Sequence, residues 1–92
     1  VNLPTHRFPT HPGTILQEEF LRPHKLSAEA LAIRISLEMN IPPPIKEIKG
    51  IIQGTKGLST EMADVLARLF NTSSNFWTVL QTNYDLALEE IV

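Results

Sequence analysis

Apolar residues recur along this chain with the three-to-four-residue spacing of amphipathic helices, and no stretch alternates convincingly with period two. The clearest stripe lies in a helix that we expect to end at Asn71, a residue suited to a left-handed cap. Its apolar positions are Met62, Val65, Leu66, Leu69 and Phe70. The pattern predicts an all-α fold of five helices.

Proline and serine mark the ends of the first two predicted helices. Pro12 occupies the first helical position of a helix that ends at Pro23. Its inward residues are Ile15, Leu16 and Phe20. Ser27 can cap the second helix, residues 28–39. Its inward residues are Leu31, Ala32, Ile35 and Met39. Ile33 and Leu37 fall off that stripe, which indicates a second contact surface or a distortion.

A proline-led segment, residues 41–57, predicts a short third helix. Pro43 or Pro44 starts it, because proline is tolerated only in the first turn, and Gly54 suits its end. Its apolar side is Ile45, Ile48 and Ile52. The opposite side has the i, i+3, i+4, i+7 spacing of one helix face: Lys46, Lys49, Gly50 and Gln53. This narrow basic face fits a helix in a DNA groove and also fits an ordinary surface helix.

The last two helices begin at Ser59 and Ser73, each a capping residue. The fifth helix, which we expect to end near Leu88, is apolar on more than one side. One side is Trp77, Leu80, Tyr84 and Leu88, and the other is Phe76, Val79 and Leu86. So much apolar surface favours a dimer seam over wholly internal packing.

Composition narrows the class of protein. Ninety-two residues make one domain, residues 12–92, preceded by an extended arm, residues 1–11, that Phe8 can anchor. Residue 1 is Val, so we expect the natural start to have been trimmed. Cysteine is absent, and no apolar run reaches membrane-spanning length or resembles a signal peptide, so we expect a cytoplasmic location.

Charge is distributed unevenly. The net charge of −2 argues mildly against nucleic acid, but three of the four lysines fall within residues 42–57. Residues 71–92 carry three acids and no Lys or Arg. The chain therefore has a basic middle and an acidic C-terminal part.

No catalytic or metal-binding pattern stands out. The three histidines have no i, i+4 pairing that would place two ligands on one helix face. Neighbouring glutamates point in different directions. We therefore expect no enzyme activity, no metal and no cofactor.

Two short capped helices joined by a tight Asn/Pro turn resemble a helix-turn-helix unit, in which the second helix lies in the major groove. Lysine and glutamine can donate to phosphates or base edges, and a glycine would let the duplex approach closely. The expected DNA-binding residues are Pro43, Pro44, Lys46, Lys49, Gly50, Gln53, Thr55 and Lys56. The expected dimerisation residues are Phe76, Trp77, Leu80, Tyr84 and Leu88.

Several short blocks that follow one another in order resemble the HigA-type antitoxins, also called virulence-associated protein I (VapI), of the Xre/Cro-like helix-turn-helix class. They are HPGTILQEEFLRP (11–23), LS (26–27), LA (31–32), IPP (41–43), GTKGLS (54–59), ARLFNTS (67–73), FW (76–77), LQ (80–81) and YDL (84–86). The resemblance implies a lambda-repressor-like, dimeric bacterial protein that binds operator DNA, represses its own operon and neutralises a HigB-like toxin that cleaves messenger RNA.

The chain departs from that family pattern in the predicted helix-turn-helix. It is about one helical turn longer between residues 32 and 41, and slightly longer between residues 43 and 54. We therefore expect an extended second helix and a re-aimed third helix. Two other functions fit the residues: a stand-alone Xre-type regulator, and a degenerate helix-turn-helix that acts only as a protein-binding module.

Overall fold

The computed structural model describes the backbone of residues 10–91 and the side chains of residues 10–90. Within these residues the chain is helical, without strands, as the periodicity predicts. The elements are α1 (Pro12–Ile15), η2 (Leu16–Leu21), α2 (Ala28–Met39), α3 (Ile45–Gln53), α4 (Thr60–Phe70) and α5 (Ser74–Ile91). Most of the predicted arm, including Phe8, lies outside the described residues.

The first helix differs from the regular α-helix that the sequence predicts, because it continues as a π-helix, η2. The Arg22 amide donates to the Gln17 carbonyl at 2.9 Å, a bond that spans five residues. Leu16 and Leu21 are both fully buried. Five residues apart on a regular α-helix they would point roughly 140° apart. The wider π-helical turn brings both into the core.

Side-chain caps start three helices where the sequence predicts them. The Ser27 hydroxyl accepts from the Ala30 amide at 3.0 Å and begins α2. The Ser59 hydroxyl accepts from the Met62 amide at 3.1 Å and begins α4. Ser73 does the same for the amide of Phe76, at 3.0 Å, at the start of α5. Each cap satisfies an amide that has no partner within its helix.

Left-handed residues end the three middle helices. Asn40 after α2, Gly54 after α3 and Asn71 after α4 have φ angles of 57°, 82° and 56°. Glycine has no Cβ to clash in this region, and asparagine tolerates it better than most residues. The ends predicted at these three positions are confirmed.

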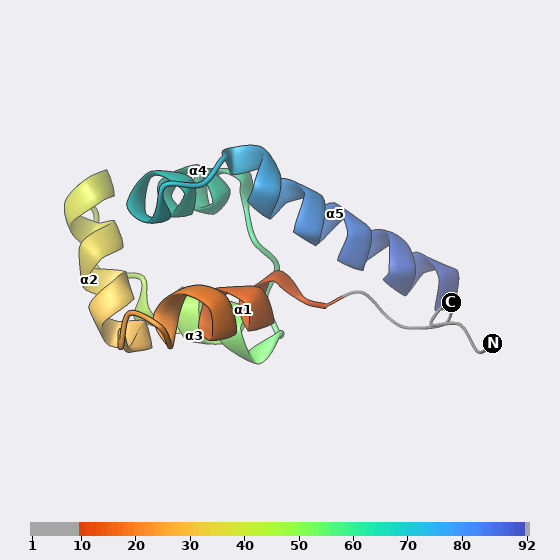
Figure 1. Cartoon of the computed structure of the whole chain (residues 1–92), viewed down its shortest axis with the longest axis horizontal. Coiled ribbons are helices and arrows are strands. Elements are labelled where there is room, and N and C mark those ends of the chain that lie inside the picture. Colours follow the sequence, from red (N-terminus) through yellow and green to blue (C-terminus); the bar gives the residue numbers. More distant parts are fainter. Residues whose placement is uncertain (1–9, 92) are drawn as a thin grey trace.

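The helices form two layers joined at one end (Figure 1). α1 and α3 lie in one layer and contact each other, and α4 packs against α5 in the other. α2 stands across the end of the molecule and contacts both α3 and α4. α5 extends away from the body formed by the other helices. α3 lies beside α1 and keeps one face exposed.

The core combines a cluster of aliphatic side chains with a group of aromatic rings. Phe20 of η2 lies at the aromatic centre, with its ring centroid 5.1 Å from both Phe70 and Trp77. The indole N–H of Trp77 donates to the Thr72 hydroxyl at 2.8 Å. The buried hydrophobic residues are Leu16, Leu21, Leu31, Ala32, Ile35, Ile48, Ile51, Leu58, Met62, Ala63, Val65, Leu66, Ala67 and Trp77.

Candidate nucleic-acid interface

Prolines set the start of α3. Pro44 occupies the position before the helix, and its carbonyl accepts from the Ile48 amide at 3.0 Å. The Pro43 carbonyl accepts from the Ile45 amide at 2.9 Å. Pro43 is exposed and Pro44 is half-buried, so both predicted DNA-binding prolines lie at the edge of the exposed surface. They fix the direction in which the chain enters the helix.

The buried and exposed residues of α3 lie on the two sides that the spacing predicts, and one further residue is buried. Ile48 is buried, and Ile45 and Ile52 pack partly against the core. Ile51, which the sequence pattern did not place on the apolar side, is fully buried as well. On the other side the predicted DNA-binding residues Lys46, Lys49 and Gln53 are all exposed.

The predicted position of Gly50 on the exposed face of α3 is wrong. It was expected on the outer face, where a duplex would meet bare backbone, but it is buried. A Cβ built on it would lie 2.9 Å from Cγ and 3.0 Å from Cδ of Lys56, because the stem of that side chain folds over the glycine. The lysine therefore occupies the space that the helical spacing alone assigned to DNA.

The Gly50 carbonyl accepts most of the hydrogen bonds that hold the turn after α3. The Gly50 carbonyl accepts from the Thr55 amide at 2.9 Å, the Lys56 amide at 3.2 Å and the Thr55 hydroxyl at 3.2 Å. Thr55 and Lys56 are exposed, as predicted. The ammonium of Lys56 is thus carried beside the outer face of α3, which gathers three lysines on one side of the molecule.

One acidic residue in this group was not identified from the sequence. The ammonium of Lys49 lies 2.9 Å from a carboxylate oxygen of Glu29, in the first turn of α2. The hydrogen bond from Lys49 lowers the pKa of the Glu29 carboxyl. The two residues are 20 positions apart, so only the crossing of α2 and α3 brings them together. No helical spacing could reveal the pair.

The exposed apolar side of α5 differs from the predicted dimerisation set. Trp77 is fully buried in its own chain, Leu80 packs partly against the core, and the Tyr84 ring meets the ring of His11 edge-on at 4.7 Å. The assignment of Trp77 to a dimer seam is therefore corrected, while Leu80 and Tyr84 are half-buried. Of the predicted set, Phe76 and Leu88 remain exposed. The exposed apolar residues of α5 are Phe76, Val79, Leu86 and Leu88.

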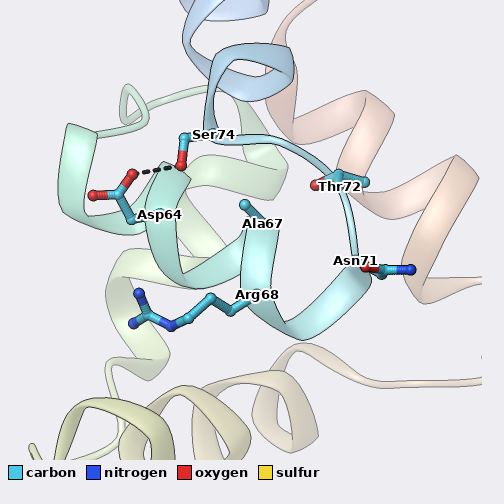
Figure 2. A pocket seen from close by; sticks show the side chains of 6 residues that line it. All are labelled: Asp64, Ala67, Arg68, Asn71, Thr72 and Ser74. Atoms are coloured by element: carbon cyan, nitrogen blue, oxygen red, sulfur yellow. Dashed lines mark hydrogen bonds between the residues drawn. The ribbon is translucent and has the colours of Figure 1, made fainter.

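A pocket of about 510 Å³ lies at the C-terminal end of α4 and is lined by Asp64, Ala67, Arg68, Asn71, Thr72 and Ser74. Figure 2 shows the carboxylate of Asp64 turned toward the hydroxyl of Ser74, which donates to it at 2.6 Å. Arg68 pairs with Glu38 of α2 at 3.1 Å, and Thr72 accepts from Trp77. The side chains of Asp64, Arg68, Thr72 and Ser74 thus already bind other parts of the chain.

Among the described residues, no group of three or more His, Cys, Asp or Glu side chains is placed to hold a metal ion. In the same part of the chain, no helix combines the length and apolar character needed to cross a membrane.

Two helices joined by a short turn, α2 with its serine cap and α3 with an exposed basic face, have α1 and α4 beside them and define a helix-turn-helix protein. Virulence-associated protein I of Dichelobacter nodosus is 39% identical over 80 residues, which cover 87% of this chain and 68% of that protein. An uncharacterised helix-turn-helix regulator of Haemophilus influenzae is also 39% identical over 80 residues, covering 87% of this chain and 69% of its own length. The chain belongs to the family of HigA-type antitoxins and virulence-associated protein I.

A solved structure agrees with this assignment. The Pseudomonas aeruginosa antitoxin HigA, determined with the higBA promoter, superposes with a TM-score of 0.74 at 37% sequence identity. The match covers 88% of this chain and 82% of that one. No model of a known protein family matches the chain.

Proposed function

We propose that this chain is a sequence-specific DNA-binding antitoxin that represses its own operon. The observation that carries the proposal is the exposed lysine group of α3 and its following turn, Lys46, Lys49 and Lys56, on the second helix of a helix-turn-helix. In this fold the second helix lies in the major groove, where lysine binds guanine edges or phosphates. The similarity to an antitoxin determined with promoter DNA supports the same reading.

The proposal predicts that Lys49→Ala weakens binding to the DNA directly upstream of the chain's own gene. Losing one ammonium lowers the salt dependence, by a slope of about 0.9 if Lys49 neutralises one phosphate. A gel-shift titrated with salt measures both effects. Arg68→Ala is the matched control, because Arg68 also joins two helices through a partly exposed ion pair but lies on α4.

Two results would contradict this proposal. Equal binding by wild type and Lys49→Ala would remove the outer face of α3 from the interface. An absence of salt-sensitive binding by the wild type would favour the degenerate helix-turn-helix that acts only on proteins.

We also propose that the chain neutralises a toxin that cleaves messenger RNA, and that it acts in the bacterial cytoplasm, where its operator lies. Support comes from the name and function of the antitoxin that it resembles. The test is to co-express the chain with the product of the neighbouring reading frame and measure messenger RNA decay. If no small basic ribonuclease-like protein is encoded there, the stand-alone regulator becomes the better reading.

Finally, we propose that the protein dimerises through α5. The far half of this helix extends from the body and exposes apolar side chains, Leu86 at 53% and Leu88 at 43% among them (Figure 1). Burial of such a surface in a two-fold partner removes it from water. With only three lysines on the outer face, two copies of the domain would also strengthen binding to one operator.

A further inference from the structure

The ion pair between Glu29 and Lys49 lies at the centre of the proposed DNA-binding surface. Its atoms are 2.9 Å apart, and the side chains remain 51% and 48% exposed. A pair this open to water contributes little to folding stability. Its position therefore matters more than its strength, because it joins the first turn of α2 to the middle of the helix proposed to enter the groove.

The pair sets Lys49 apart from its neighbours. Within the described part of the chain, neither Lys46 nor Lys56 forms an ion pair, so both offer their full charge to DNA. The charge of Lys49 is offset by the Glu29 carboxylate. A glutamate carboxyl is already ionised near neutrality, and the hydrogen bond from Lys49 lowers the pKa of Glu29 further.

We propose that Glu29 is a positioning residue that determines specificity, by restraining Lys49 from phosphates while holding its ammonium ready for a base edge. This inference rests on the proposed DNA-binding function. On random DNA, the Lys49 ammonium can contact a phosphate only if its ion pair with Glu29 breaks. The Glu29 carboxylate also repels that phosphate. At the operator, an ammonium with three N–H donors can keep Glu29 and still donate to guanine N7 or O6.

The experiment compares Glu29→Gln with wild type on two duplexes of equal length, the upstream DNA and a random sequence, across a salt titration. Glu29→Gln is expected to bind random DNA about fivefold more tightly, the effect of one unscreened charge pair near 4 Å in water. Its salt slope on random DNA should steepen by about 0.9, the contribution of one freed lysine. Binding to the upstream DNA should change less, so the ratio of the two affinities falls.

Three further variants isolate the cause. Glu38→Gln is the matched control. Glu38 also lies on α2 and also forms an ion pair with another helix, but its partner is Arg68 of α4. The affinities of this variant for both duplexes should therefore stay unchanged. Glu29→Gln in a Lys49→Ala background should have a clearly smaller effect on random DNA than it has in wild type, because only the direct repulsion between the carboxylate and phosphate is then removed. Glu29→Asp keeps the charge but shortens the reach, so the repulsion of phosphate stays while the restraint on Lys49 is weakened. Its affinity for random DNA should therefore lie between those of wild type and Glu29→Gln.

Several results would overturn the inference. One is an unchanged ratio of the affinities for upstream and random DNA in Glu29→Gln, which includes the case in which both affinities rise equally. Another is an effect of Glu29→Gln that is just as large in the Lys49→Ala background. Both leave the proposed function standing if the wild type binds upstream DNA with salt sensitivity. If the wild type does not, the proposed function and this inference fail together. Melting temperatures equal to that of wild type would establish that each variant is folded.

Discussion

Trp77 is the largest fully buried side chain in the described part of the chain, and it has both packing and polar partners. Its ring lies 5.1 Å from Phe20 and 5.0 Å from Phe76, and its N–H is bonded to Thr72. We expect Trp77→Ala to lower the free energy of unfolding by about 3–5 kcal/mol, because it leaves a cavity that the neighbours fill only partly. Urea denaturation monitored by circular dichroism measures the change.

Trp77→Phe serves as the control for that measurement. It keeps an aromatic ring in the cavity and removes the hydrogen bond to Thr72, so its loss of stability should be clearly smaller. A loss below about 1 kcal/mol for Trp77→Ala would mean that the indole is peripheral.

His11 makes the stability of the first helix depend on pH. Its Nδ1 accepts from the Gly13 amide at 2.9 Å, and Asp85 and the Lys56 backbone favour its charged form. Burial outweighs both and lowers the pKa of His11 below its usual value. The unfolded chain therefore binds a proton at higher pH than the folded chain does. Stability is full above pH of about 6.5 and falls as the pH decreases through and below that value.

We expect wild type to lose more stability between about pH 7 and pH 5 than His11→Asn does. Asparagine retains a side-chain acceptor for the cap but does not titrate. Denaturation curves of both proteins at the two pH values provide the comparison. Parallel losses in the two proteins would assign the pH dependence to other groups.

At the scale of elements, the contact between α1 and α3 fixes the position of the proposed reading helix. A Cβ on Gly13 would lie 1.7 Å from the carbonyl oxygen of Ile51, an impossible approach to rigid backbone. We expect Gly13→Ala to destabilise the fold by about 1–3 kcal/mol or more, because α1 and α3 must separate. The same variant should weaken DNA binding in proportion to the displacement of α3. Thermal melting and gel-shift measure these two effects.

Gly57→Ala is the control for this substitution. Its added Cβ would meet only the side-chain end of Gln81, at 3.4 Å or more. The change should therefore be nearly neutral. If Gly13→Ala and Gly57→Ala melt alike, the close approach of α1 to α3 does not determine the position of the reading helix.

Local chemistry explains why the helices could be predicted from the sequence. Ser27 and Ser59 cap the helices that follow them, and Asn40 and Gly54 end theirs in left-handed conformations. Caps and ends of this kind depend on residues a few positions apart. The π-helix, by contrast, follows from the burial of Leu16 and Leu21 together, which depends on the remainder of the core.

The candidate site could be predicted only in part, for the same reason. Lys46, Lys49 and Gln53 share one helix face by spacing alone, and the structure exposes all three. The burial of Gly50 depends on how the Lys56 side chain folds back after the turn. The Glu29–Lys49 pair depends on the packing of α2 against α3. Tertiary contacts of this kind leave no periodic signal in the chain.

The inward and outward sides of α5 were hard to separate because apolar residues surround the helix. Periodicity grouped Trp77 with Leu88, yet Trp77 lies in the core and Leu88 is exposed. Only the docking of α5 on α4 and α1 decides which residues face inward. α2 is unbroken from Ala28 to Met39, the range that the sequence predicts. The re-aiming of α3 stays a prediction.

At the scale of the whole molecule, the proposed dimer predicts a mass and an operator geometry. Light scattering at micromolar concentration should give twice the mass of the chain. Leu86→Lys should shift the protein toward monomer, because it places a charge within the exposed apolar side of α5. A two-fold dimer should also favour a palindromic operator with half-sites roughly 34–36 Å apart.

Lys25→Glu is the control for charge alone, since Lys25 is exposed in the turn before α2. It should leave the mass unchanged. A monomer mass for the wild type would contradict the dimer and leave the apolar side of α5 without this partner.

The separation of buried and exposed residues on α3 has a consequence for how the DNA specificity of such a protein can evolve. Ile48, Gly50 and Ile51 hold the helix in the fold, while Lys46 and Gln53 touch little besides solvent. Mutations at the outer positions therefore leave folding stability almost unchanged. A duplicated copy of the gene can acquire a new operator through a few such mutations, without first accumulating stabilising changes elsewhere. The two copies would then cease to repress each other while keeping the same architecture.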